Sequence, residues 1–262
     1  MQPCISTTIF AQRPLADVLP PIARAGFKFI EISRNSRNWG AANAILRDLG
    51  LNVWAVHGRI VLQLDSCSEE QQRMAVDEER AAMDDIAAYA PCPYVIHFLC
   101  GSRAPEPRSV WVKTVDGLLR HCEELNLSLA VEALPYKPEA LLHHAESLEV
   151  AAFVRSVQSR NISVCFDINH VNITEKVEAA AANFAGLISN IHFSDNHGQG
   201  EEHLPPGEGV IDFVAGMRAV RAAGYAGPVN LEVHVGGEPS HELLVRLRES
   251  AESIDRQAAL PS

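Results

Sequence analysis

Six residues of metal-binding type recur along the chain at intervals close to the length of one strand–helix unit. The intervals are 40, 35, 35, 25 and 40 residues, and the residues are His57, His97, Glu132, Asp167, His192 and Glu232. Imidazole nitrogens and carboxylate oxygens are the usual protein ligands of divalent cations. If the six side chains converge, the chemistry open to them is that of a bound divalent cation.

Each of these residues lies at or near the end of a segment with the composition of a buried β-strand. Side chains alternate between the two faces of a strand, and the residues two positions before the candidates are small or polar. They are Ala55, Val95, Ala130, Cys165, Asn190 and Asn230. The intervening positions hold bulkier side chains, such as Trp54, Ile96 and Phe166. We therefore predict that the bulky face packs on helices and that the candidates point into the interior of a closed sheet.

Eight strands are predicted in all, and helical patterns separate them. The strand segments are 4–10, 27–33, 51–57, 93–99, 127–133, 162–168, 188–194 and 228–234. The helical pattern is clearest over 68–90 and 240–255, and Ser68 with Gln71 predicts a capping box at the start of the first. Gly26, Gly50 and Gly224 each end a helical pattern directly before a strand, where a left-handed residue is needed.

This alternation predicts an α/β fold, a single-domain (β/α)8 TIM barrel that occupies residues 1–262. A doubly wound open sheet is the main alternative. It usually has a glycine-rich phosphate-binding loop after its first strand, and residues 10–15 contain no glycine. Barrel enzymes build their sites at the carboxyl ends of the strands, so the candidates are expected on one face of the barrel.

Three carboxylates and one imidazole form the core of the predicted site. Buried carboxylates that share one axis repel one another unless a cation lies between them. We therefore predict a shared metal site made by Glu132, Asp167, His192 and Glu232. One divalent cation gives a formal charge of +2 − 3 = −1, and this oxygen-rich ligation favours Mn²⁺ or Mg²⁺, with Zn²⁺ or Co²⁺ as alternatives.

Five further residues are predicted to bind substrate or to act as additional metal ligands. They are His57, His97, His170, Glu201 and His203. A structural role stays open for each, and the loop that carries Glu201 and His203 could equally be a solvated acidic loop. Asp195 is expected to orient that loop. Glu31 ends the second strand with inward parity and could touch the substrate, but a structural role is expected for it.

The overall composition narrows the classes of partner and compartment. Lys and Arg total 22 and Asp and Glu total 33, so the net charge is −11. This balance argues against nucleic acid and anionic membrane surfaces as partners. The sequence has no apolar run long enough to span a bilayer and no signal-peptide pattern, and its six cysteines are scattered. These features predict a cytoplasmic protein.

Several motifs along the chain resemble the sugar phosphate isomerase/epimerase group of the xylose isomerase-like barrel superfamily, which also includes endonuclease IV. The motifs are GFKFIEI, AVHG, VIHF, AVEAL, FDINH, IHFSD, HLPPGEGVIDF and GYAGPVNLEV. The resemblance runs from about residue 4 to 254. It implies a divalent metal on Glu132, Asp167, His192 and Glu232, and substrate-side histidines at His57, His97 and His170. It also implies that the barrel can form a homo-oligomer.

The resemblance implies a metal-dependent isomerase or epimerase that acts on a sugar, keto-sugar or related polyol through an enediolate, with Glu132 and Glu232 as the acid/base pair. A dehydratase on the same site is one alternative. The other is a hydrolase or phosphodiesterase like endonuclease IV with up to three Zn²⁺ ions, in which the five additional residues become ligands. Because the chain is acidic, the nuclease alternative is the weaker one.

Overall fold

Eight parallel strands form the central sheet of this computed structural model, which describes residues 1–10, 13–36, 42–58, 68–98, 100–101, 107–135, 142–143 and 146–260. The strands are β1 (Pro3–Ser6), β2 (Phe29–Ser33), β3 (Asn52–His57), β4 (Pro93–Phe98), β6 (Ser128–Ala133), β8 (Ile162–Asp167), β9 (Ile188–His192) and β10 (Val229–Leu231). Their order in the sheet is β10-β1-β2-β3-β4-β6-β8-β9. All eight predicted strands are therefore present, in the order of a (β/α)8 barrel.

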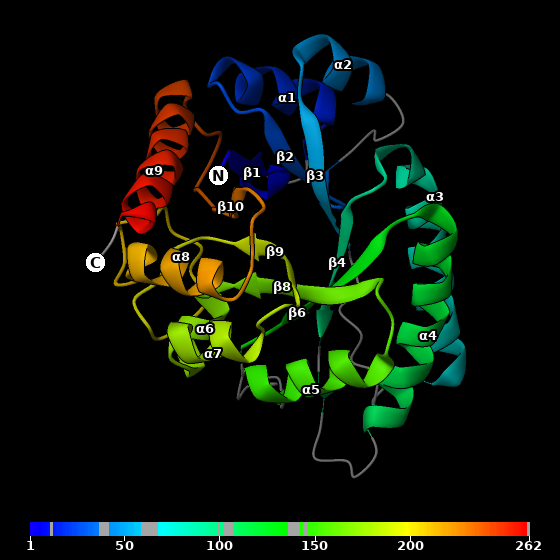
Figure 1. The fold of residues 1–262 in the computed structure, drawn as a ribbon. Helices are drawn as coiled ribbons and strands as arrows, with labels where there is room; N and C mark the ends of the chain where they lie inside the picture. The colour runs from blue at the N-terminus through cyan, green and yellow to red at the C-terminus, as the bar shows by residue number, and fades with distance from the viewer. Residues whose placement is uncertain are drawn as a thin grey trace.

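Helices surround the sheet on its outer side (Figure 1). They are α1 (Leu15–Arg24), α2 (Ala42–Leu49), α3 (Glu69–Ile86), α4 (Pro107–Leu125), α5 (Ser147–Val157), α6 (Ile168–Thr174), α7 (Val177–Asn183), α8 (Phe213–Ala222) and α9 (His241–Ala259). The predicted start of α3 is confirmed, because Gln71 N donates to Ser68 Oγ over 3.2 Å and Ser68 N donates to Gln71 Oε1 over 2.8 Å. Gly26, Gly50 and Gly224 have φ values of 91°, 65° and 96°, as their places after helices require.

The barrel closes between β9 and β10 through contacts just beyond the two strands. Phe193 forms a single parallel bridge with Leu231. Phe193 N donates to Asn230 O over 2.8 Å, and Glu232 N donates to Phe193 O over 3.2 Å. These contacts complete the ring that the other strands build by regular pairing.

The buried side chains of the strands form two separate clusters, one on each face of the sheet, as the alternation pattern predicted. The large apolar core lies between sheet and helices and includes Ile96, Phe166 and Ile191. A second, small cluster of Val95, Ala130 and Cys165 lies apart from it. These three residues belong to the face predicted to point inward. The inward parity of the site residues is thus supported by the packing.

Two features differ from the predicted strand boundaries. The first strand was expected over 4–10, but it ends at Ser6 and a 3₁₀ helix, η1 (Thr7–Phe10), follows. The side chain of Thr7 explains the break, because its Oγ1 accepts from Ser33 N over 2.8 Å and draws the chain across the end of β2. A small antiparallel pair, β5 (Cys100–Gly101) with β7 (Leu142–His143), was not predicted.

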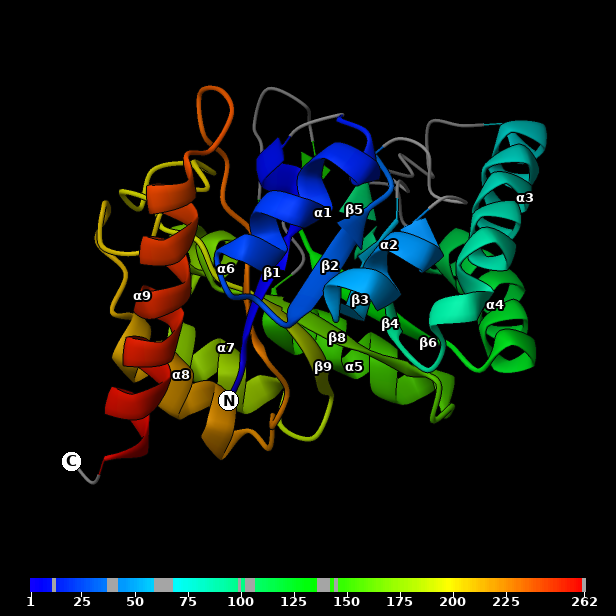
Figure 2. The ribbon, with the colours of Figure 1, turned by 90° about the horizontal axis from the view of Figure 1, so that it is seen from above.

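The N-terminus and the end of α9 lie on the opposite side of the molecule from β5 (Figure 2). The side that carries β5 is the one toward which the carboxyl ends of the strands point. No helix in the described part of the chain is long and apolar enough to cross a membrane.

Candidate metal centre

Four side chains from four strand ends meet around one nitrogen atom, Nδ1 of His192. It lies 3.0 Å from Glu232 Oε2, 3.2 Å from Glu132 Oε1 and 3.8 Å from Asp167 Oδ2. His192 and Glu132 are fully buried, and Asp167 and Glu232 are nearly so. The structure therefore brings the predicted quartet together, with three carboxylates facing the same imidazole nitrogen.

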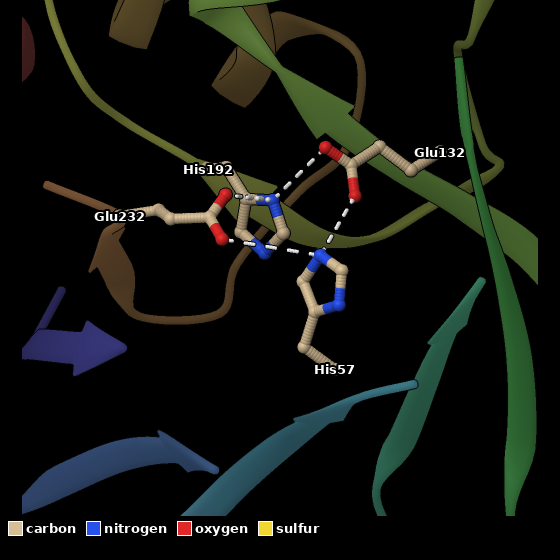
Figure 3. A group of neighbouring side chains, drawn as sticks. All are labelled: His57, Glu132, His192 and Glu232. Carbon is tan, nitrogen blue, oxygen red and sulfur yellow. Dashed lines mark hydrogen bonds and ion pairs between the residues drawn. The ribbon is translucent and has the colours of Figure 1, made fainter. Parts of the chain in front are cut away.

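A second imidazole covers this group from the side of β3. Nε2 of His57 lies 3.4 Å from Glu132 Oε2 and 3.9 Å from Glu232 Oε1. Figure 3 shows His57 facing both carboxylates. The rings of His57 and His192 are stacked, with centroids 5.4 Å apart and planes 11° from parallel. His97 follows on β4, with Nε2 3.6 Å from Glu132 Oε2. Glu132 is thus shared by four histidines, namely His57, His97, His192 and His170.

A third group occupies the other side of the quartet. Asp167 caps α6 by accepting from His170 N over 3.0 Å, which explains the D-x-x-H spacing and directs His170 inward. Nδ1 of His170 lies 3.3 Å from Glu132 Oε1. Glu201 Oε1 lies 3.0 Å from His203 Nε2 and 3.5 Å from His170 Nε2. Glu201 and His203, predicted to bind substrate or to act as additional metal ligands, thus lie together beside His170.

The loop that carries Glu201 and His203 is organised by Asp195, as expected. The fully buried carboxylate of Asp195 accepts hydrogen bonds from the backbone N–H groups of Asn196, Gly207, Gly209 and Ile211. His203 adopts a left-handed backbone conformation, with φ of 53°. Its carbonyl oxygen accepts from His234 N over 2.9 Å, which ties the loop to the chain beyond β10.

The carboxylates of the cluster create an electrostatic environment that favours positive charge on the groups beside them. Burial opposes ionisation of Glu132 and Glu232, but the neighbouring histidines, His192 foremost, hold the pKa of both carboxyl groups well below the usual range. Burial and the nearby Glu132 raise the pKa of Asp167 to about 6, despite the opposing effect of His170.

The histidine pKa values respond to the same carboxylates. Although burial disfavours the charged form, Glu132 and Glu232 raise the pKa of His57 to about 9. The pKa of His170 rises to about 10 against the same effect of burial, because Asp167, Glu201 and Glu132 surround it. Burial lowers the pKa of His97 to about 4. In the metal-free cluster, protons on the histidines thus supply the positive charge that a divalent cation would supply when bound.

An open cavity of about 340 Å³ lies above the quartet. Seven predicted residues line it, namely His57, His97, Glu132, His170, Glu201, His203 and Glu232. Asp167 and His192 are buried and are not among its lining residues. Sequence reasoning gave no role to the five other lining residues, Thr8, Ser33, Asn35, Gly58 and His234. The parity of β2 could have indicated Ser33, which lies two positions after the inward-facing Glu31.

Residues 19–257 match the family model described as xylose isomerase-like TIM barrel. The chain belongs to this family. The match covers every strand from β2 to β10, so it includes all the residues of the predicted site. The predicted family and the predicted barrel are both confirmed.

Two curated relatives share parts of this barrel. Each is 30% identical to the chain, over 123 residues for an uncharacterized protein of Methanocaldococcus jannaschii and over 158 residues for an uncharacterized protein of Sinorhizobium fredii. The matched segments are 45% and 56% of this chain. They span 41% and 49% of the relatives, so the chain spans less than half of either protein.

Solved structures with the same fold include sugar epimerases. A D-tagatose 3-epimerase-like protein superimposes with a TM-score of 0.82 at 17% identity, covering 98% of both chains. An L-ribulose 3-epimerase gives a TM-score of 0.77 at 20% identity, covering 98% of this chain and 96% of that one. The IolI protein, whose structure has a zinc atom bound, gives 0.80 at 16% identity, covering 98% and 99%. At these identities, the likeness shows the fold.

Proposed function

We propose that the protein is a divalent-metal-dependent sugar isomerase or epimerase. The observation that carries the proposal is the convergence of Glu132, Asp167 and Glu232 on Nδ1 of His192 at the floor of the cavity. Family membership and the fold shared with sugar epimerases support the same activity.

The donor set fits a divalent cation on grounds internal to the site. Glu132 Oε2 and Asp167 Oδ2 are buried without a hydrogen-bond partner, and a buried carboxylate oxygen in that state is costly. His57, Glu132, His192 and Glu232 each offer a ligand atom within 4.8 Å of the others, and so do Glu132, Asp167 and His170. Three carboxylates with one imidazole support Mn²⁺ or Mg²⁺ as the ion, with Zn²⁺ or Co²⁺ as alternatives.

In this proposal Glu132, Asp167, His192 and Glu232 hold the ion, and Glu132 and Glu232 also exchange protons with the substrate. A bound cation would polarise a sugar carbonyl and acidify the adjacent C–H. Glu132 lies at the end of β6 and Glu232 just beyond β10, three strands away in the ring. One carboxylate can therefore remove the proton while the other returns one from a different side. A proton returned to the opposite face of the same carbon inverts it.

The histidines around the cavity supply hydrogen bonds of two kinds. His57 and His170 line the cavity, and the protonated form that their raised pKa values favour in the metal-free protein donates from both ring nitrogens. The lowered pKa of His97 keeps that ring neutral, and its buried Nδ1 has no hydrogen-bond partner. This arrangement supports a substrate with several hydroxyl groups.

Metal content and proton exchange test the proposal together. About one Mn, Mg, Co or Zn per chain is expected in protein purified without added metal. A screen of ketoses and aldoses in deuterated water should then find a substrate that gains deuterium at one carbon without losing water. Loss of water would point to a dehydratase on the same site. Protein that binds no divalent cation would overturn the proposal.

Variants of the two proposed acid/base residues complete the test. Glu132→Gln and Glu232→Gln should each abolish turnover. Because both residues are also proposed ligands, metal content is measured in parallel, and turnover is compared in variants saturated with metal. Activity near that of the wild type in either variant would reject its assignment.

One observation favours a second candidate, a hydrolase or phosphodiesterase with several metal ions. His170, Glu201 and His203 offer three ligand atoms within 4.8 Å of one another beside the quartet. Two or three Zn per chain, with cleavage of an abasic-site duplex, would support it. Glu201→Gln separates the two proposals, since it should leave a single-metal site loaded but should lower the stoichiometry of a multi-metal one.

A further inference from the structure

Beneath the quartet lies a carboxylate that does not reach the cavity. Glu31 on β2 is fully buried, and its Oε2 atom is the meeting point of three nitrogen atoms. They are Nε2 of His192 at 2.9 Å, Nδ2 of Asn190 at 2.8 Å and Nδ2 of Asn230 at 3.0 Å. Its partners come from β9 and β10, so Glu31 reaches across the interior of the barrel.

The orientation of Asn190 is fixed from the other side. The indole nitrogen of Trp54 lies 3.0 Å from Asn190 Oδ1, and an indole N–H can only donate. The carbonyl oxygen of the Asn190 amide must therefore face Trp54, and its NH₂ group must face Glu31. A second side chain thus presents a donor to the same carboxylate oxygen.

The same reasoning determines which nitrogen of His192 carries the hydrogen toward Glu31. Oε2 of Glu31 accepts from the NH₂ groups of Asn190 and Asn230, so it is an acceptor, and His192 Nε2 donates to it. The lone pair that a cation needs is then on Nδ1, the atom that faces Glu132, Asp167 and Glu232. Glu31 and the proposed cation site thus lie on opposite edges of one imidazole ring.

We propose that Glu31 is a positioning residue that fixes the tautomer and ring orientation of His192 and so strengthens binding of the divalent cation. The inference rests on the proposed metal site and assigns a role to a residue outside it. A carboxylate that accepts from the far nitrogen of a histidine ligand typically contributes 10–100-fold in metal affinity. A merely structural role for Glu31 would affect folding and leave that affinity unchanged.

The test compares Mn²⁺ and Zn²⁺ dissociation constants, measured by competition with a chelating dye, in the wild type and Glu31→Gln. The matched control is Glu79→Gln, which alters another buried glutamate, one that contacts Tyr94 and Arg34 and none of the quartet. Glu31→Gln should bind about 10–100-fold more weakly, and Glu79→Gln should bind as the wild type does. Equal affinity in Glu31→Gln and the wild type would overturn the proposal.

A measurement on the wild type keeps the inference testable if Glu31→Gln does not fold. Nitrogen NMR of the imidazole groups in zinc-loaded protein should find the proton of His192 on Nε2 and the zinc on Nδ1. The opposite arrangement would reject the role of Glu31 while leaving the metal site intact. A wild type that binds neither ion would instead reject the proposed function, and the role of Glu31 with it.

Discussion

Gly209 lies directly against Asp195, and its backbone N–H donates to Oδ2 of that carboxylate over 2.9 Å. A Cβ atom at position 209 would overlap with Asp195 Oδ1 and with the carbonyl oxygen of Asn196. The loop that presents Glu201 and His203 to the cavity is therefore held by a contact that tolerates no side chain.

Gly209→Ala should displace this loop. We expect a loss of about 1–3 kcal/mol in the free energy of unfolding, as for other overpacked sites, and weaker binding of any ligand that touches Glu201 or His203. Gly200→Ala is the matched control, because a Cβ there meets nothing within 4 Å. Denaturant unfolding of both variants checks the expectation. Equal losses would show that the contact with Asp195 is not tight.

Gly58 gives a second steric prediction on the other side of the site. A Cβ at this position would lie 2.8 Å from both Tyr94 Cε1 and Val95 O. Since Gly58 follows His57, whose Nδ1 lies 2.9 Å from Gly58 O, Gly58→Ala should shift the His57 ring. We expect roughly 1–3 kcal/mol of destabilisation and a lower kcat/KM. Gly236→Ala, with open space around its Cβ, serves as the control.

The raised pKa values of His57 and His170 predict alkaline destabilisation of the metal-free protein. The ordinary pKa of histidine is 6.5, and in the fold the pKa rises to about 9 for His57 and to about 10 for His170. Their contribution is therefore complete below about pH 6.5 and is lost as the pH rises through 9 and 10. The melting temperature in chelator, recorded from pH 7 to about pH 10, should fall, and His57→Gln should flatten part of that fall.

Asp167 acts on stability over a lower pH range. Its pKa is raised from 3.8 to about 6, so its protonated form is the one that the fold favours. This contribution is present below about pH 3.8 and is lost as the pH rises through 6. Asp167→Asn should remove this pH dependence in metal-free protein, as pH-dependent denaturant unfolding would show. An unchanged profile would contradict the raised pKa.

Metal addition should raise the melting temperature. At a free metal concentration of 100 times Kd, the expected gain is about 2.7 kcal/mol, or roughly 5–10 °C for a domain of this size. Differential scanning fluorimetry with and without Mn²⁺ or Zn²⁺ measures it, and Glu132→Gln should reduce the shift. A melting temperature that no divalent cation changes would contradict the proposed site.

The barrel and the quartet could be predicted because both follow from a period of two along each strand. Parity alone indicated that Glu132 and His192 point inward, and the structure places them 3.2 Å apart. The role of Glu31 could not be predicted in this way. Parity predicts the face of the sheet on which a side chain lies, but it does not predict its height along the barrel axis. The register pairs Glu31 with Ala55 and Ser33 with His57, so Glu31 lies one layer below the site.

Residues on irregular backbone were the hardest to foresee. Thr8 lies in η1, where a strand was expected, because the bond from Ser33 N to Thr7 Oγ1 ends β1 early. Asn35 lies beyond β2 and lines the cavity from a turn. No periodicity describes such segments, and long-range hydrogen bonds decide where their side chains lie.

The joint between β9 and β10 is the least paired in the ring, since a single bridge closes it, whereas β4 and β6 are in register over six residue pairs. His192 is the last residue of β9, and Glu232 directly follows β10. An ion held by both would act as a removable cross-link over this joint, as a disulfide does between two segments of chain. Exchange of the amide hydrogens of Phe193 and Glu232 with solvent would then report whether the cross-link is in place.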